Sequence, residues 1–518
     1  MKSRKILTEN GLFYLIIAAF SFVLLYFCTA SSFRYETNPW NDANAFFTVG
    51  KAMFNGIVPY RDIFEQKGPL LYFIHGIAYL ISNSTFTGVY IFEGISLFVF
   101  SVYIYKCSAL YINKALSCIV SVATSCFVVN SFAFYCGDSA EEFILPTMSV
   151  GLYYILKYFK NSKCEQIKWY VFLICGFLAG CVAMIKFTLL GFWLGWMALL
   201  ALHTLFARKE VANAFKFSFI FLLGMFLAII PWIIYFAVKG ALADFINVYF
   251  VINATAYAND NNIITRVLDL FYYYNVRFEQ YPVVVSASTL SCLLPLVLKK
   301  FTDGKVFSRI AVPFMFVITT FFIYIGGVNY TYYYLPLTIY VFLPLVLLLG
   351  LIPEFKDEKI VLKICSVLIS TLLVVLSVKT NPVVDNIAKK GETTFQNTVT
   401  DYIYSHNPEG KILNYGRLDT GVYLRNDYTN LFKHFEGQNI KYEEFTENID
   451  EQNRYIDEHE AFYVVTTMPS DDLQKIYNRN QTLKEDYKLV MTVPYEIINQ
   501  ADIRETKEHY CFLFELDE

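Results

Sequence analysis

Charged side chains crowd a polar loop between the first two apolar segments of the chain. Asp42 closely follows the first segment, and Arg61, Asp62, Glu65 and Lys67 precede the Gly-Pro pair where the chain turns apolar again. The pKa of a partly desolvated carboxylate can rise toward neutrality, which suits a general base. Basic side chains bind phosphate through charge-assisted hydrogen bonds. Beside a membrane, this combination predicts chemistry on a lipid-linked ionic substrate.

The same residues also have structural interpretations. Asn41 or Asp42 is suited to cap the helix that ANAFFTVGKAM predicts. Arg61 and Lys67 could anchor the chain at the interface, or pair with the neighbouring carboxylates as weak surface ion pairs. The positive-inside rule disfavours basic residues on the outer face, so a bound phosphate would offset that bias. Phosphate contact and simple ion pairing both stay open at this point.

A second polar connection, CGDSAEEFILPTM, carries Asp138, Glu141 and Glu142. Acidic side chains suit a helix start, where the helix dipole favours them, and these three equally suit the positioning of an acceptor or a cation. Glu93 lies inside an apolar segment and Lys186 separates two such segments. Ionisable side chains at such depths mark candidate functional sites. We expect Lys186 to pair with a carboxylate, and Glu93 and Lys186 to line a pocket.

Tyrosines gather in a late connection, GGVNYTYYYLP. An aromatic belt at the membrane interface is the simpler interpretation. The alternative is that Tyr333 and Tyr334 line the pocket and stack on a sugar ring or an isoprenoid. The connection 239–281 has the pattern of an amphipathic interfacial helix. Carboxylate clusters permit a divalent cation without requiring one, and no HExxH or paired CxxC pattern indicates a tightly held zinc. Metal and cofactor therefore stay unknown.

These residues need a polytopic α-helical membrane scaffold. The 518 residues are 56% hydrophobic and 17% charged, and the mean hydropathy is +0.42, which excludes an ordinary soluble protein. A net charge of -3 without a basic patch gives no support for a nucleic-acid partner. About eleven apolar segments are predicted to cross the membrane: 11–30, 88–106, 115–134, 143–159, 169–185, 187–206, 215–238, 282–298, 308–326, 335–352 and 360–378.

The topology follows from charge. The basic start MKSRK places the N-terminus in the cytoplasm, the first segment is expected to be a retained helix, and the short run 69–82 is expected to enter and leave on the outer side. Eleven crossings put the polar C-terminal domain outside a cytoplasmic membrane. We expect a transmembrane domain over 1–379 and a small soluble α/β domain over 380–518. Its expected strands are KILNYG, AFYVVTT and HYCFLFEL, and its expected helices lie near 392–406, 442–459 and 470–486.

The order of these motifs resembles the GT-C class of membrane glycosyltransferases, in its protein mannosyltransferase-like and lipid A aminoarabinose transferase-like branch. The resemblance rests on Asp42, FEQKGPLLYF, DSAEEFILP and YYYLP. It implies that Asp42 is essential at the reaction centre and that Lys67 binds the lipid phosphate. Gly68 stands where the branch usually has the first of two prolines, and Tyr333 where histidine is frequent.

The resemblance implies an inverting glycosyltransferase that moves a sugar from a polyprenyl-phosphate donor to an acceptor hydroxyl at the outer membrane face. Arg61 and Lys67 would stabilise the leaving phosphate, and Asp138, Glu141 or Glu142 would position a glycan, lipid or protein acceptor. The alternatives are a transporter or flippase of lipid-linked saccharides, and a polysaccharide polymerase. Transporters tend to have internal repeats and ionisable groups near the midplane. The chain has no evident repeat and its charges gather at one face, which favours interfacial catalysis.

Overall fold

The computed structural model of the chain describes residues 2–160, 167–256, 262–298, 305–353, 360–425, 429–499, 503 and 505–517. The chain forms two compact units, each built from three stretches of sequence. Unit 1 comprises Met1–Cys28, Glu93–Trp232 and Asn261–Asn381. Unit 2 comprises Thr29–Phe92, Ile233–Asp260 and Pro382–Glu518.

Each of the apolar segments predicted to cross the membrane forms a helix, wholly or largely in unit 1. The helices are α1 (Lys2–Cys28), α4 (Thr87–Ser108), α5 (Lys114–Val129), α6 (Ala140–Lys160), α7 (Trp169–Ala183), α8 (Gly191–Leu202), α9 (Val211–Val238), α12 (Pro282–Val297), α13 (Val306–Tyr324), α14 (Leu343–Leu349) and α15 (Ile360–Thr380). Short helices extend α8 at both ends, as η1 (Phe187–Leu190) and η2 (His203–Ala207), and η5 (Thr331–Tyr340) precedes α14.

Seven stretches of the described chain are helical, long and apolar enough to cross a membrane: Gly11–Cys28, Thr87–Ser108, Phe187–Ala207, Val211–Val238, Val306–Tyr324, Thr331–Leu349 and Val361–Thr380. Many of their large apolar side chains are exposed, including Phe215, Phe219 and Leu222 on α9. A soluble protein would not expose so much apolar surface, whereas lipid tails cover it without cost. The predicted class, a multi-pass α-helical membrane protein, is confirmed.

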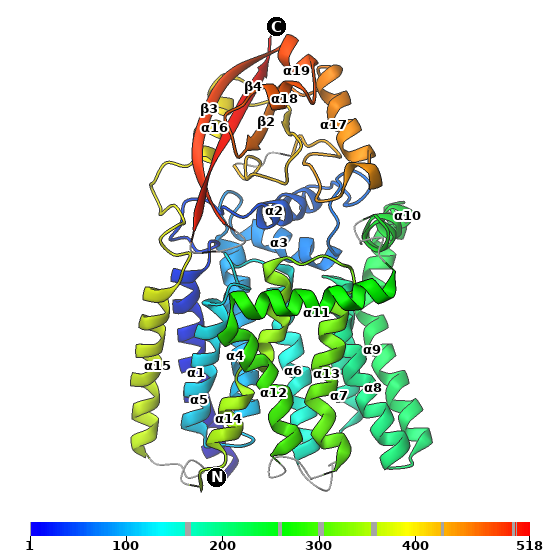
Figure 1. Cartoon of the computed structure of the whole chain (residues 1–518), viewed down its shortest axis with the longest axis vertical. Coiled ribbons are helices and arrows are strands. Elements are labelled where there is room, and N and C mark those ends of the chain that lie inside the picture. Colours follow the sequence, from blue (N-terminus) through cyan, green and yellow to red (C-terminus); the bar gives the residue numbers. More distant parts are fainter. Residues whose placement is uncertain are drawn as a thin grey trace. The chain divides into compact units, whose positions relative to one another are not determined.

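The amphipathic connection also forms the helix that its pattern predicts. Helix α11 (Ile263–Gln280) runs across α12 and α13 rather than along them (Figure 1). Ile264, Leu268, Phe271 and Tyr272 are exposed at spacings of a helical stripe. This stripe suits a helix at a membrane interface.

In unit 2, α2 (Asn41–Phe54) packs closely on α3 (Pro69–Ile81), which forms over the run expected to enter and leave on one side. The approach is close because glycines face it: a Cβ at Gly50 would lie 2.7 Å from atoms of Tyr72, His75 and Gly76. Unit 2 also contains α10 (Leu242–Phe245) and η3 (Ile246–Ile252). Residues 29–92 thus belong to the same compact unit as the tail from Pro382 onward. From the sequence, we expected them to belong to the transmembrane domain 1–379.

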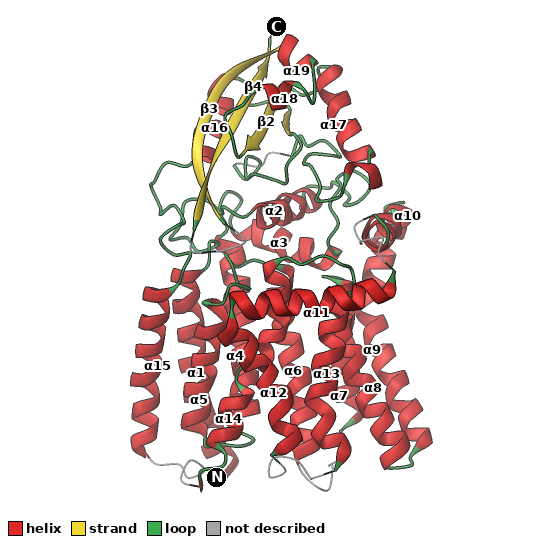
Figure 2. Cartoon of the chain, viewed as in Figure 1, coloured by secondary structure: helices red, strands yellow, loops and turns green. Residues whose placement is uncertain are grey.

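The C-terminal tail, residues 382–518, has the mixed α/β structure predicted for it. Its strands are β1 (Ile412–Asn414), β2 (Tyr463–Met468), β3 (Tyr487–Ile498) and β4 (Thr506–Leu516), of which Figure 2 shows β2, β3 and β4 in yellow. The strand order is β1-β2-β4-β3, with β1 parallel to β2 and the other pairs antiparallel. The helices are α16 (Phe395–His406), η7 (Tyr442–Glu444), α17 (Glu447–Asp457), α18 (Gln474–Tyr477) and α19 (Thr482–Glu485).

Strand β3 was not among the predicted strands. It lies at the edge of the sheet, where a proline such as Pro494 is tolerated. Its residues alternate between exposed and half-buried positions, because only one face is covered. The core of the tail lies against the sheet and includes Leu413, Val464, Phe512 and Phe514.

Candidate functional site

The first predicted site residue, Asp42, lies in the first turn of α2 and is buried. The N-cap of α2 is Trp40, whose side chain makes no capping hydrogen bond, so neither Asn41 nor Asp42 occupies the cap position. The capping interpretation is therefore wrong. Three other polar side chains of α2, Asn44, Thr48 and Lys51, are also buried and share one face of the helix at spacings of four and three residues.

A loop of the tail covers this polar face of α2. The Thr48 hydroxyl donates a 2.6 Å hydrogen bond to Asp419 Oδ2, and Lys51 Nζ donates a 2.5 Å bond to the Tyr423 carbonyl. The amide of Asn44 donates to the Asn38 carbonyl at 3.1 Å. Burying so many polar groups would destabilise the fold if they lacked such bonds. The first loop and the tail therefore form one polar network in unit 2.

Lys67 lies in a compact turn just before α3. Its ammonium group is 3.6 Å from Glu65 Oε1 and 5.5 Å from the centroid of the Phe46 ring. Its backbone carries the turn: the amide donates to Glu65 Oε2 at 2.8 Å, and the carbonyl accepts from the Tyr60 hydroxyl at 2.7 Å. The Tyr72 hydroxyl also donates to Glu65. The lysine is thus held on a backbone that several buried groups fix.

Arg61 is engaged differently. It makes two hydrogen bonds to Asp62, at 2.7 and 2.8 Å, and its Nη1 donates to the Lys239 carbonyl at 2.5 Å. Both side chains are largely exposed, at 41% and 37%, and the arginine holds the pKa of Asp62 below its usual value. Of the two interpretations left open for Arg61, these contacts favour the surface ion pair.

In unit 1, three buried carboxylates converge at the start of α6. The backbone amide of Asp138 donates 2.8 Å hydrogen bonds to both Glu93 Oε1 and Glu142 Oε2. Asp138 itself adopts a left-handed conformation, with φ of 61°, which a non-glycine residue rarely holds without support. Ser139 accepts from the Glu142 amide at 3.0 Å, as a residue before a helix does. Glu93, predicted only as part of a pocket, therefore joins the acidic loop.

Lys186 has the carboxylate partner that was expected for it. Its Nζ lies 2.6 Å from Glu141 Oε1, and both side chains are largely buried, at 13% and 1% exposed. The same ammonium group lies 3.7 Å from the centroid of the Tyr333 ring and 5.7 Å from that of Tyr332. Cation–π contacts of this geometry stabilise a desolvated cation. Lys186, Glu141 and Tyr333 therefore form one cluster.

The tyrosines of GGVNYTYYYLP do not form an exposed belt. Tyr332, Tyr333 and Tyr334 are all buried in η5. Tyr334 packs among aromatic rings, with centroids 5.6 Å from Phe132 and 6.3 Å from Tyr274. Tyr333 thus lies beside Lys186, whereas Tyr334 packs among the aromatic rings of unit 1.

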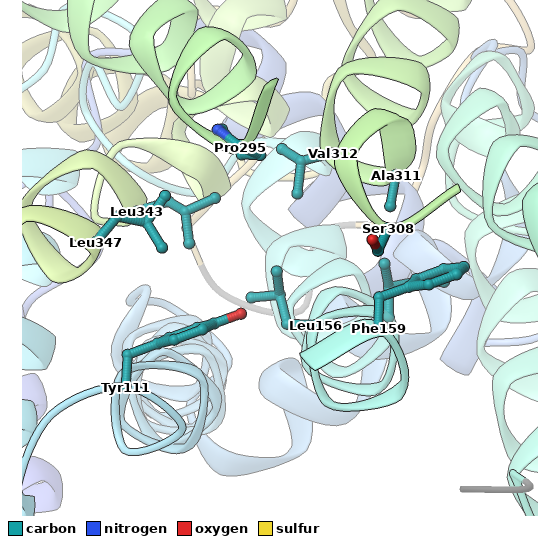
Figure 3. A pocket seen from close by; sticks show the side chains of 10 residues that line it. Tyr111, Leu156, Phe159, Pro295, Ser308, Ala311, Val312, Leu343 and Leu347 are labelled. Atoms are coloured by element: carbon teal, nitrogen blue, oxygen red, sulfur yellow. The ribbon is translucent and has the colours of Figure 1, made fainter. Parts of the chain in front are cut away.

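Two cavities of unit 1 are lined by residues other than the predicted ones. One has a volume of about 20 Å³ and is apolar, with Tyr111, Leu156, Phe159, Pro295, Val312 and Leu343 around it (Figure 3). That volume is enough for about one water molecule, not for a substrate. The other, of about 240 Å³, is lined by Lys157, Lys168 and neighbouring tyrosines. Among the residues that the structure describes, no group of three or more His, Cys, Asp or Glu is arranged to hold a metal ion.

Sequence reasoning did not select Thr48, Lys51, Asp419 or Glu436. Asp419 and Glu436 are buried, and the Asp419 amide donates a 2.5 Å bond to Glu436 Oε2. Burial raises the pKa of Asp419 to about 6 and raises that of Glu436 well above its ordinary value. Both carboxylates come from the polar tail, in which acidic residues are common, so no local signal distinguishes them from surface residues.

The comparisons with known proteins concern most of the chain. A protein-family model described as the putative competence-induced protein Ccs4 N-terminal domain matches residues 4–378. No curated protein matches the chain. Among solved structures, ArnT from Cupriavidus metallidurans with undecaprenyl phosphate bound has a TM-score of 0.58 at 10% identity, over 98% of each chain.

The apo form of the same ArnT has a TM-score of 0.57 at 10% identity, also over 98% of each chain. A weaker likeness, with a TM-score of 0.49 at 11% identity, covers 94% of this chain and 73% of an oligosaccharyltransferase from Archaeoglobus fulgidus. At such identities a likeness concerns the fold. The GT-C membrane fold that the order of motifs predicted is confirmed.

Proposed function

We propose a transferase function for this chain, which belongs to the family of the putative competence-induced protein Ccs4 N-terminal domain and has the GT-C fold. The reaction is the transfer of a sugar from a polyprenyl-phosphate donor to an acceptor hydroxyl, with inversion at the anomeric carbon. The observation that carries the proposal is the arrangement in unit 2. Buried Asp42 lies in the first turn of α2, and Lys67 lies two residues before the start of α3.

The lysine and the fold both support a polyprenyl-phosphate donor. ArnT, which has the same fold, was solved with undecaprenyl phosphate bound. A phosphate monoester or diester needs a cation beside the membrane, and the ammonium group of Lys67 is partly exposed on a fixed turn. Exposed apolar side chains on the helices of unit 1 suit an isoprenoid chain. We assign phosphate binding to Lys67 and give Arg61 at most a supporting role, because its donors already contact Asp62 and Lys239.

The chemical step is a single displacement. Asp42 accepts the proton of the acceptor hydroxyl as that oxygen attacks the anomeric carbon. The bond between the anomeric carbon and the phosphate oxygen breaks on the opposite face, and the electron pair leaves with the phosphate. Lys67 stabilises the negative charge that develops there. The products are the inverted glycoside, polyprenyl phosphate and protonated Asp42.

Acceptor positioning is assigned to the loop at the start of α6. Asp138, Glu141 and Glu142 are buried there, and Glu141 is paired with Lys186. Carboxylates are strong acceptors for sugar hydroxyl groups. With the N-terminus in the cytoplasm, as the basic residues near it favour, the reaction takes place on the outer face of the cytoplasmic membrane.

The test is transfer from a panel of radiolabelled polyprenyl-phosphate monosaccharides in membranes that contain the chain. Wild type is compared with Asp42→Asn and Lys67→Ala. Asp62→Asn is the matched control, because it makes the same substitution at an exposed ion pair in the connection that follows α2. We expect label in an acceptor with wild type and the control, and a loss of about 100-fold or more with Asp42→Asn, as removal of a general base predicts.

Normal transfer by Asp42→Asn would refute the mechanism. Movement of lipid-linked sugar across the bilayer without transfer, unchanged in Asp42→Asn, would identify a flippase instead. Transfer of preassembled glycans but not monosaccharides would identify a polymerase.

A further inference from the structure

The tail contacts both segments that carry the proposed reactive groups. We define the tail clamp as residues 419–423 and 433–438. We propose that the tail clamp positions the Lys67 loop against α2, with Gln438 as the positioning residue for that loop. The inference rests on the proposed function, because it gives the tail a role in holding the donor phosphate.

Three contacts join the clamp to the loop just before Lys67. The Phe64 amide donates a 2.8 Å hydrogen bond to the Lys433 carbonyl. The centroid of the Phe64 ring lies 5.2 Å from that of His434, and Phe64 also stacks on Phe445, just outside the clamp, at 5.0 Å. The Gln66 amide group donates a 2.8 Å bond to Gln438 Oε1. The clamp therefore holds the loop through its backbone at Phe64 and through the Gln66 side chain, one residue before the lysine.

Two contacts join the clamp to α2, as described above for Thr48 and Lys51. Gly421 also lies against Asn44, since a Cβ at that glycine would be 3.2 Å from the Asn44 side chain. Gly421 has φ of 89°, a conformation that favours glycine and lets the loop pass this close to the helix. These contacts hold α2, which carries Asp42 in its first turn.

Glu436 connects the two sets of contacts. Its Oε2 accepts from the Asp419 amide, and its Oε1 accepts a 3.0 Å bond from the Gln438 side chain. Hydrogen bonds thus run without a break from Thr48 through Asp419, Glu436 and Gln438 to Gln66. Burial and the neighbouring carboxylates of Asp419 and Glu65 raise the pKa of Glu436. The raised pKa favours the neutral form of Glu436, which adds no negative charge near the proposed phosphate site.

The chemical consequence concerns donor binding rather than turnover. Gln438 touches neither proposed reactant, so its loss leaves Asp42 and Lys67 in the chain but frees the loop between them. A neutral hydrogen bond of this kind changes an equilibrium by about three- to tenfold. We therefore expect the dissociation constant and the KM for the donor to rise by about three- to tenfold. The kcat at saturating donor and the KM for the acceptor should stay unchanged.

The experiment uses the purified full-length chain and three variants, Gln438→Ala, Gln66→Ala and the double variant. Gln474→Ala is the matched control, because it removes an exposed glutamine that contacts Asn478 in the same tail. Binding of undecaprenyl phosphate is measured directly, and hydrogen exchange is measured for the peptide that contains residues 58–67. Thermal unfolding of each variant checks that the fold is retained.

The expected result is faster exchange in this peptide and weaker binding in both single variants, with the double variant no worse than either. Such non-additivity arises because each substitution breaks the same hydrogen bond. Unchanged exchange, or faster exchange with unchanged binding, would overturn the inference. If wild type binds no undecaprenyl phosphate while exchange still responds to Gln438→Ala, the proposed function fails and the clamp is only structural.

Discussion

The Thr48 hydroxyl and the Asp419 carboxylate, separated by 371 residues of sequence, form a 2.6 Å hydrogen bond in the interior of unit 2. Asp419 Oδ1 also accepts from the Gly421 amide at 2.8 Å. A carboxyl group that is withdrawn from water in this way responds to pH, because burial disfavours its charged form. The pair links helix α2, which carries Asp42 in its first turn, to the tail.

Stability should therefore depend on pH through Asp419. Burial raises its folded-state pKa to about 6, from an ordinary value of 3.8, although Thr48, the Gly421 amide and Lys51 oppose the shift. Between these values the folded chain keeps a proton that the unfolded chain loses, so stability falls as pH rises from about 4 to about 6. Asp419→Asn should remove this slope, worth at most about 3 kcal/mol.

Thermal unfolding in detergent at several pH values measures the effect. Asp401→Asn is the control, since Asp401 is exposed and paired with Arg425 at the surface. A slope that persists unchanged in Asp419→Asn would assign the pH dependence to other groups, of which Glu436 is the nearest.

Lys67 and Arg61 should differ sharply in how much they contribute to binding the donor phosphate. Lys67→Ala removes a charge-assisted contact to phosphate, so kcat/KM for the donor should fall by about 10- to 100-fold. Arg61→Ala removes an exposed ion pair with Asp62, so the change should be at most about fivefold. Initial rates over a range of donor concentrations separate the two. Equal losses in both variants would return Arg61 to the phosphate site.

The Lys186–Glu141 pair should matter for folding as well as for the acceptor. Removing one partner leaves a buried charge, which typically costs about 3–5 kcal/mol. Glu141→Gln and Lys186→Met should each lower the unfolding temperature, and the double variant should recover part of the loss. Glu210→Gln, in the more exposed pair with Arg208, is the control and should have little effect. A double variant less stable than both single variants would contradict this.

Close packing of α2 on α3 should make Gly50 sensitive to a single methyl group. Gly50→Ala would bring a Cβ to 2.7 Å from the α3 backbone, so we expect a loss of about 1–3 kcal/mol and lower transfer activity as α2 moves. Gly11→Ala is the matched control, because a Cβ there meets no described atom within 4 Å. Unfolding temperatures and transfer rates of the two variants provide the comparison. Equal unfolding temperatures and transfer rates in the two variants would show that α3 shifts to accommodate the added methyl group.

Much of the architecture could be predicted because hydropathy is a local property. Each apolar segment, from the one before Asp42 to that ending near Thr380, forms a helix, since a stretch of apolar residues in lipid satisfies its backbone internally. The three predicted strands of the tail coincide with β1, most of β2 and most of β4 for the same local reason. Strand β3 was not predicted because Pro494 interrupts its sequence pattern. In addition, apolar and polar residues alternate only weakly along this edge strand.

The candidate site could be predicted only in part. The sequence by itself determined the membrane helices, the acidic and basic loops that carry Asp42, Lys67 and Asp138, and the order of motifs typical of the GT-C fold. Tertiary structure alone decided that Glu93 contacts Asp138, that Lys186 pairs with Glu141, and that Asp419 and Glu436 join α2 to the lysine loop. Such contacts join residues far apart in sequence, and the free energy that favours them comes from burial and hydrogen bonding, which exist only once the chain has folded.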